Sequence, residues 1–191
     1  EDGKYWNQGV RVDLGLVVSN NGIHFREPIP DHKVIERGGP GEWDEIALLQ
    51  GHAFVNEGDK TMMWYSHWDT GGKLKDMEIG LATLRRDGFG YLSRKVPDSP
   101  SRFETAHFTS TAAATVLVNA DGLSAEAPLT IQLLDTEAKP VEGAVAKVSE
   151  SGTRVAVALP GGIPSGESFA LRVTLPYSGD AKVYSVYVDT K

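Results

Sequence analysis

The chain has 191 residues, 40% of them hydrophobic, which is enough to bury the core of one sizeable domain or two small ones. Its net charge is -7 and it contains no block of lysines or arginines, so we expect neither nucleic acid nor a membrane as a partner. Cysteine is absent, which excludes disulfides and thiolate metal sites. The 21 glycines and 10 prolines favour many short strands joined by tight turns, so we expect an all-β chain.

The first predicted element is a β-hairpin. From Val10 to Val18, apolar residues alternate with other residues, the period of a strand with one apolar face. The sequence Ser-Asn-Asn-Gly follows at 19–22, and Asn-Gly accepts the positive φ angles of a tight turn. We therefore expect residues 23–25 to return antiparallel beside the first strand.

Three further strands are predicted at 46–55, 61–67 and 78–84, after a loop rich in proline and glycine. Polar and glycine-containing turn sequences separate them. This even spacing predicts an up-and-down antiparallel meander, the arrangement of one blade of a β-propeller.

A change in composition and periodicity divides the chain into two predicted domains. Residues 94–102 are polar, contain two prolines and lack periodicity, so we expect a linker there. Beyond it, at 103–191, several segments alternate apolar and polar residues at a spacing that predicts a small β-sandwich. The predicted strands of this second domain include 116–119, 129–133, 155–159, 169–175 and 183–188.

Several segments in the first half carry a family resemblance. They are GLVVSNNGIHFREP at 15–28, GEWDE at 41–45, MMWYSHWD at 62–69 and IGLATLRRDGFGYLS at 79–93. In order and spacing they resemble the last blades of the five-bladed β-propeller glycoside hydrolases, the group that contains families 32 and 43. The segments VLVNADG, IQLLD and KPVEG, between residues 116 and 143, resemble the β-sandwich that follows the propeller in many such proteins.

This resemblance implies that residues 1–93 form a partial propeller: the outer strands of one blade and a complete last blade. Because a propeller needs about four blades to close its ring, we expect an N-terminal remainder, either a separate cleaved chain or a region absent from this sequence. The main catalytic carboxylates of the family lie mostly in earlier blades, and we expect them in that remainder.

The function implied is hydrolysis of glycosidic bonds in poly- or oligosaccharides by a secreted or periplasmic bacterial enzyme. This chain would contribute part of the pocket wall and a bracing sandwich, and is not expected to be active alone. A non-catalytic glycan-binding or adhesion module that kept the fold but lost the acids is the alternative from another class.

The best pocket candidates precede the predicted innermost strand. Asp44 and Glu45 are weak candidates for catalytic carboxylates, and the indole of Trp43 offers an apolar face for stacking on a sugar ring. In the structural alternative, Asp44 caps a turn and Trp43 packs between blades.

Two residues of that innermost strand, 46–55, are also candidate site residues. Gln50 and His52 share one face of 46–55, so they are predicted to look toward a central channel, with Gln50 near substrate. We expect no required cofactor, but His52 is a candidate ligand for a structural cation in that channel. The alternative is that His52 serves the fold.

His67, Trp68 and Asp69 follow the predicted middle strand of the meander, where members of the family place residues near substrate. The i, i+2 spacing of His67 and Asp69 predicts that both point toward ligand hydroxyls. Trp64 and Tyr65 are equally consistent with packing between blades.

Overall fold

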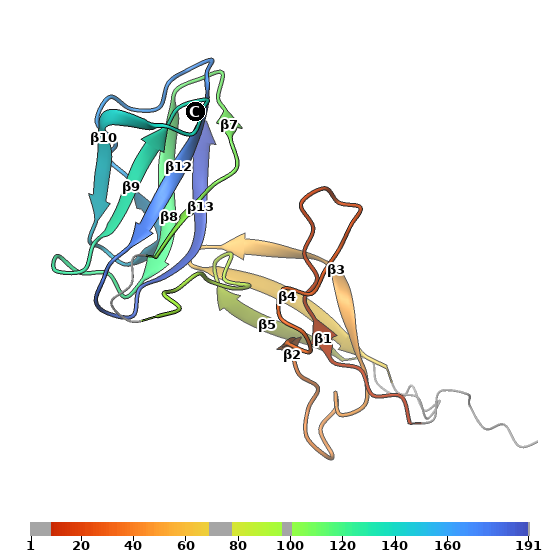
Figure 1. Cartoon of the computed structure of the whole chain (residues 1–191). Coiled ribbons are helices and arrows are strands. Elements are labelled where there is room, and N and C mark those ends of the chain that lie inside the picture. Colours follow the sequence, from red (N-terminus) through yellow and green to blue (C-terminus); the bar gives the residue numbers. More distant parts are fainter. Residues whose placement is uncertain (1–8, 69–77, 97–100, 191) are drawn as a thin grey trace, which may run out of the picture. The chain divides into compact units, whose positions relative to one another are not determined.

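The computed structural model describes residues 9–68, 78–96 and 101–190, and these contain strands and turns but no helix, so the expected all-β class is confirmed (Figure 1). None of the described segments is a helix long and apolar enough to cross a membrane. The chain divides into two compact units, unit 1 at Glu1–Phe89 and unit 2 at Gly90–Lys191.

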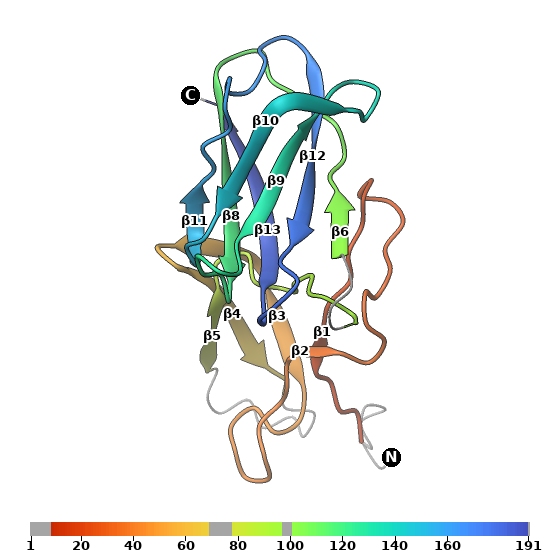
Figure 2. The same cartoon turned by 60° about the vertical axis from the view of Figure 1, so that its left-hand side comes forward.

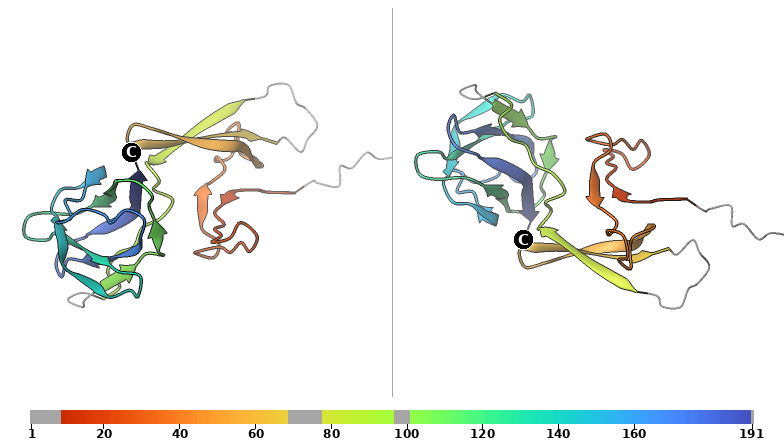
Figure 3. Two further views of the ribbon diagram at one scale, coloured as in Figure 1. Left: turned by 90° about the horizontal axis from the view of Figure 1, so that it is seen from above. Right: turned by 90° about the horizontal axis from the view of Figure 1, so that it is seen from below.

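Unit 1 contains a three-stranded antiparallel meander in the order β3-β4-β5. Its strands are β3 (Leu48–Glu57), β4 (Lys60–His67) and β5 (Ile79–Arg85). The three strands predicted from the sequence are therefore confirmed, with boundaries shifted by at most two residues. A separate pair, β1 (Leu14–Gly15) and β2 (Lys33–Ile35), lies on one side of this sheet (Figure 3).

The N-terminal hairpin differs from the prediction. Only two residues of the expected strand at 10–18 belong to β1, and an isolated bridge between Val18 and Arg26 replaces the expected return strand. The side-chain oxygen of Asn21 accepts hydrogen bonds from the backbone N–H groups of Ile23 (3.0 Å) and His24 (2.9 Å). These side-chain bonds satisfy backbone donors that a regular ladder would otherwise use, so the segment folds as a loop.

Three polar side chains, which we name the hairpin clamp, tie the turn between β3 and β4 to the end of β5. The hydroxyl of buried Thr61 donates to the Asn56 amide oxygen (2.5 Å) and accepts from the backbone N–H of Asp87 (2.8 Å). The Asn56 amide nitrogen in turn donates to the Asp87 carboxylate (2.6 Å). The Arg-Asp-Gly-Phe turn after β5 thus has a structural role in holding the meander together.

Unit 2 consists of two antiparallel sheets (Figure 2). One has the order β10-β9-β12-β6, with β7 also pairing with β12, and the other has the order β11-β8-β13. The bounds are β6 (Ser101–Glu104), β7 (Phe108–Thr109), β8 (Ala114–Asp121), β9 (Leu129–Leu134), β10 (Pro140–Val148), β11 (Gly152–Ala156), β12 (Ser168–Leu175) and β13 (Lys182–Thr190).

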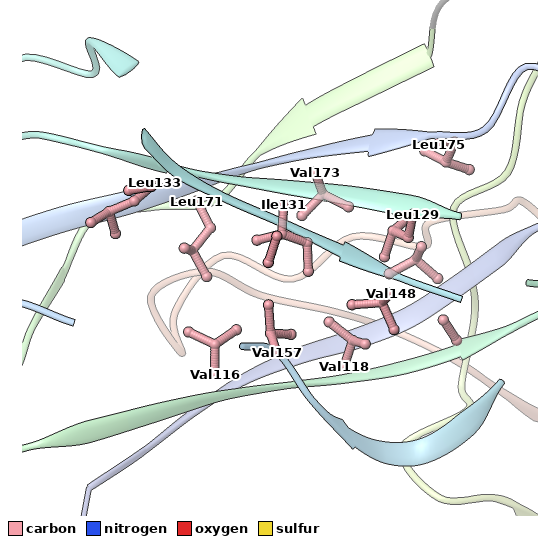
Figure 4. Close-up of a cluster of buried hydrophobic side chains, with 14 of the residues drawn as sticks. Val116, Val118, Leu129, Ile131, Leu133, Val148, Val157, Leu171, Val173 and Leu175 are labelled. Carbon is pink, nitrogen blue, oxygen red and sulfur yellow. The ribbon is translucent and has the colours of Figure 1, made fainter. Parts of the chain in front are cut away.

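The core of unit 2 lies between these sheets (Figure 4). Alternate residues of β8, such as Val116 and Val118, face alternate residues of β9 and β12, such as Ile131 and Leu171. All four are essentially inaccessible to solvent. The period-two pattern of 129–133 and 169–175 therefore identified the core-facing side of β9 and β12.

The sequence analysis did not predict three strands of unit 2, namely the short β6 and β7 and the longer β10. The pairing of β10 with β9 is irregular between Pro140 and Val145, where the ladder shifts register. The side-chain nitrogen of Gln132 on β9 lies 2.8 Å from the Val141 carbonyl and 3.1 Å from that of Ala144, so it satisfies acceptors that the irregular ladder leaves open. The irregularity interrupts the alternation by which a strand is recognised.

We expect Thr61→Val to lower the free energy of unfolding of unit 1 by about 1–3 kcal/mol, because buried partners of the hydroxyl become unsatisfied. The measurement is denaturant unfolding followed by tryptophan fluorescence, since all four tryptophans belong to unit 1. Thr83→Val, at an exposed threonine of β5, is the matched control and should change the value by less than about 0.5 kcal/mol. Equal losses in both variants would contradict the role of the hairpin clamp.

Candidate functional site

Residues 38–45, which we name the glycine loop, lead directly into the meander. Their fold is local: the Glu42 carboxylate accepts the Gly39 N–H (2.7 Å), and the Glu45 carboxylate accepts the Gly41 N–H (2.7 Å). A backbone hydrogen bond from Gly38 N–H to the Asp44 carbonyl (3.3 Å) closes the loop. Both ends of this loop are thereby held in place beside β3 and β4.

Asp44 is the buried polar residue of this loop, with 7% of its surface exposed. Its carboxylate accepts a hydrogen bond from the Tyr65 hydroxyl of β4 (3.1 Å). Gly38 makes room for it, because a Cβ atom at that position would lie 2.2 Å from the Asp44 Oδ1. The sequence Gly-Gly-Pro-Gly before Asp44 thus allows the backbone to close over the carboxylate.

Trp43, Tyr65 and His67 form what we name the aromatic cluster. The Trp43 indole stacks on the Tyr65 ring with centroids 5.5 Å apart, and meets the His67 ring edge-on at 5.4 Å. Tyr65 and His67 are two residues apart on β4, so their side chains point to the same face of the sheet. Trp43 remains 36% exposed, which leaves part of its ring accessible to a ligand.

Tyr65 is held against the sheet by Gly80 of β5. A Cβ atom at Gly80 would lie 2.4 Å from the Tyr65 Cζ, so only glycine leaves room for the ring in this position. Burial, followed by the hydrogen bond to Asp44, raises the pKa of Tyr65 above its usual value of 10.0. Tyr65 therefore stays protonated and serves as a fixed hydrogen-bond donor to the carboxylate.

The site brings together three of the residues proposed from sequence: Trp43, Asp44 and His67. Glu45 is adjacent, but its carboxylate is already bonded to the Gly41 N–H. Trp68 is half-buried and its backbone N–H donates to the Ala47 carbonyl (2.8 Å), which holds the end of β4 beside the start of β3. Asp69 lies outside the described residues, so its proposed pairing with His67 stays a prediction.

One ring nitrogen of His67, Nδ1, is buried without a hydrogen-bond partner among the described residues. A buried polar atom without a partner costs free energy, typically about 1–3 kcal/mol. Trp43 thus positions the ring, and the described residues leave its Nδ1 without a partner.

Gln50 and His52 lie elsewhere, along an apolar groove of about 270 Å³ between β3 and the β1–β2 segment. Both side chains are exposed. The pairing of β3 with β4 shifts register between Gln50 and Phe54, so simple alternation of faces does not hold there. No group of three or more metal-ligating side chains occurs within the described residues, and cation binding by His52 stays a prediction.

Tyr65 is the member of the site that the sequence reading did not select. The available signal was its i, i+2 spacing from His67 on a strand, which places both rings on one face. That signal was ambiguous, because an aromatic residue at such a position is equally expected in a packed core.

Comparisons of the chain with protein-family models, with curated proteins and with solved structures gave no match. The interpretation of the site therefore depends on the chemistry of Trp43, Asp44, Tyr65 and His67 themselves.

Tyr65→Phe is expected to destabilise unit 1 at neutral pH by about 1–3 kcal/mol, since the buried Asp44 carboxylate loses its donor. The raised pKa means that the folded state retains the Tyr65 proton more strongly than the unfolded state does. This contribution is fully present below pH 10 and is lost as the pH rises through the folded pKa. The stability gap between wild type and Tyr65→Phe should therefore narrow above about pH 10.

The measurement is denaturant unfolding by tryptophan fluorescence at a series of pH values. The gap between wild type and Thr83→Val should stay constant over the same series, because that substitution removes no titrating group. A Tyr65→Phe gap that is unchanged or wider at high pH would contradict the assigned hydrogen bond.

Proposed function

We propose that the chain is the C-terminal portion of a carbohydrate-active enzyme that hydrolyses glycosidic bonds, similar to the five-bladed propeller hydrolases of families 32 and 43. Unit 1 would form the last blades of the propeller, and unit 2 a β-sandwich that braces it. The observation that carries the proposal is the aromatic cluster of Trp43, Tyr65 and His67 beside the recessed carboxylate of Asp44.

The chemistry of this cluster suits a sugar. The apolar face of a pyranose or furanose ring packs on an aromatic face, and its hydroxyls need nearby hydrogen-bonding groups. The exposed part of the Trp43 ring would supply the first, and the neighbouring His67 ring the second. Trp43 would therefore define one wall of a substrate pocket.

Hydrolysis needs two carboxyl groups, one as general acid and one as base or nucleophile. Asp44 is the better candidate in this chain, because its carboxylate lies beside the aromatic cluster, whereas that of Glu45 is directed to the Gly41 N–H within the glycine loop. The main catalytic carboxylates would lie in an N-terminal remainder of the same propeller. The buried His67 Nδ1, which has no partner among the described residues, supports this proposal, since a further polypeptide segment would satisfy it.

The surface of unit 1 also supports a missing remainder. Large apolar side chains are exposed on each strand of the meander, at a density that an isolated domain avoids. These residues are Leu49, Phe54 and Val55 on β3, Trp64 on β4, and Ile79 and Leu81 on β5. In the proposed protein, neighbouring blades would cover them. We further propose a secreted or periplasmic location, and neither nucleic acid nor membrane as a partner, given the net charge of -7.

A non-catalytic glycan-binding module is the second candidate. It is favoured by the burial of Asp44, whose carboxylate is 7% exposed and bonded to Tyr65, so that the Trp43 ring is the more accessible part of the site. In that case the aromatic cluster binds sugar and the carboxylate only supports the glycine loop.

Trp43→Ala should weaken oligosaccharide binding by the chain at least tenfold, because the sugar loses its stacking surface. Binding is measured by isothermal titration calorimetry against neutral oligosaccharides released from plant, algal and bacterial polysaccharides. Trp64→Ala, an exposed tryptophan of the same meander, is the matched control and should bind like wild type. Absence of binding by the wild type, or equal losses in both variants, would contradict the proposal.

A second experiment separates the enzyme from the binding module. In the polypeptide that includes the N-terminal remainder, Asp44→Asn is expected to lower kcat/KM for oligosaccharide hydrolysis at least 100-fold, because a carboxylate is replaced by an amide that does not exchange protons. The melting temperature should stay close to that of wild type, since the amide oxygen still accepts the Tyr65 hydrogen bond. Unchanged turnover would exclude Asp44 from catalysis, and sugar binding without any turnover in the wild type would favour the binding module.

A further inference from the structure

A second cavity borders the glycine loop, on the side of β1 and β2. This cleft has a volume of about 370 Å³ and is lined mostly by charged side chains from three segments of unit 1. We name it the basic cleft after its three cationic side chains, although three carboxylates also line it. Its lining residues are Arg11, Asp13, Lys33, Glu36, Arg37, Gly38, Pro40 and Glu45. Gly38 and Glu45 belong to the glycine loop that also carries Asp44, so the basic cleft adjoins the candidate sugar site.

Asp13 organises two cations at this cleft. Its carboxylate accepts the backbone N–H of Arg37 (2.9 Å) and lies 3.0 Å from the Lys33 ammonium. The Arg37 guanidinium is 3.9 Å from the same carboxylate. These interactions, led by the backbone hydrogen bond, hold the pKa of Asp13 below its usual value of 3.8. Both cationic side chains are therefore oriented before any ligand arrives.

The charged side chains of the basic cleft differ in how far they are exposed to solvent. The Asp13 side chain is 16% exposed, whereas those of Lys33 and Arg37 are 44% and 31% exposed. The two cations are therefore more accessible to a ligand than the carboxylate between them.

Arg11 adds a third cation, also exposed. Its guanidinium donates to the neighbouring Val10 carbonyl (2.9 Å) and forms no ion pair with a carboxylate of the described residues. Of the other two carboxylates, that of Glu45 is directed to the Gly41 N–H, and Glu36 is exposed to solvent. Arg11 is therefore the cation of the cleft that pairs with no carboxylate of the described residues, and its planar fork suits a carboxylate or a sulfate.

We propose that the basic cleft binds an anionic substituent, a carboxylate or a sulfate ester, on the saccharide that occupies the neighbouring aromatic cluster. This inference rests on the proposed carbohydrate function and narrows the substrate class to acidic oligosaccharides. Arg11 is the principal contact to the anion. Asp13 is a positioning residue that fixes Lys33 and Arg37 in contact with it.

The test compares three ligands with the same chain, by isothermal titration calorimetry: an oligogalacturonate, a sulfated oligogalactan and a neutral oligogalactan of the same length. The wild type should bind at least one anionic ligand about tenfold or more tightly than the neutral ligand, and this preference should shrink as salt rises from about 50 mM to about 500 mM. The two anionic ligands separate a uronate site from a sulfate site.

Arg11→Gln should weaken binding of the preferred anionic ligand about tenfold and change binding of the neutral ligand less than about twofold. Arg26→Gln, at an exposed arginine of unit 1 outside the basic cleft, is the matched control and should match wild type for all three ligands.

Asp13→Asn tests whether Asp13 positions the two cations or only contributes a negative charge. Simple attraction between charges predicts tighter anion binding when this negative charge is removed, whereas a site in which Asp13 positions Lys33 and Arg37 predicts weaker binding. We expect weaker binding, with folding checked by tryptophan fluorescence. Tighter binding would overturn the positioning role of Asp13.

The outcomes separate the two proposals. Equal binding of neutral and anionic ligands, or equal effects of Arg11→Gln and Arg26→Gln, would overturn the basic cleft and leave the carbohydrate function standing. If none of the three ligands binds and the neutral oligosaccharides of the first binding experiment also fail, both proposals are overturned.

Discussion

The hydrogen bond from the Tyr65 hydroxyl to the Asp44 carboxylate is the interaction on which the organisation of unit 1 around its site depends. It fastens the glycine loop to the middle strand of the meander, and the same loop supplies walls to both the aromatic cluster and the basic cleft. Two glycines make the bond possible, since a Cβ atom at Gly38 would collide with the carboxylate and one at Gly80 with the ring. A single donor and acceptor pair thus determines the geometry of two adjoining surfaces.

The two units differ in how much of their apolar surface they bury. In unit 2 the alternating residues of two sheets meet in one core, and Leu129, Ile131 and Leu171 are fully buried. Each such side chain contributes about 1.5–3 kcal/mol to folding by leaving water. In unit 1, by contrast, Phe54 and Trp64 remain exposed on the meander, and stability depends more on specific polar links such as the hairpin clamp. Such a surface is consistent with a fold that further polypeptide completes.

The sequence predicted those elements whose side chains alternate without interruption. Most of the predicted strands of unit 2 follow this pattern, because each has one face toward the core. For the meander, whose first strand shifts register between Gln50 and Phe54, the sequence instead predicted the turns between the strands. It failed at β10, whose pairing is irregular between Pro140 and Val145, and at the first hairpin, where the Asn21 side chain replaces ladder hydrogen bonds. It also missed the roles of Tyr65 and Asp13. Their importance comes from partners 21 to 24 residues away, namely Asp44 and Arg37, and no local pattern encodes such pairings.

The charges around the glycine loop bear on how a sugar would be oriented. The Asp44 carboxylate lies next to the aromatic cluster, whereas the exposed cations Arg11 and Lys33 lie across Gly38 from it, in the basic cleft. A neutral sugar would be oriented mainly by stacking, which tolerates rotation about the normal of the ring. An acidic sugar would gain a second, directional contact, because a guanidinium and a carboxylate or sulfate prefer a coplanar bidentate geometry. Two anchors of different chemistry would fix the rotation that one leaves open, and in the proposed enzyme this fixed orientation would bring the glycosidic bond to a catalytic carboxylate.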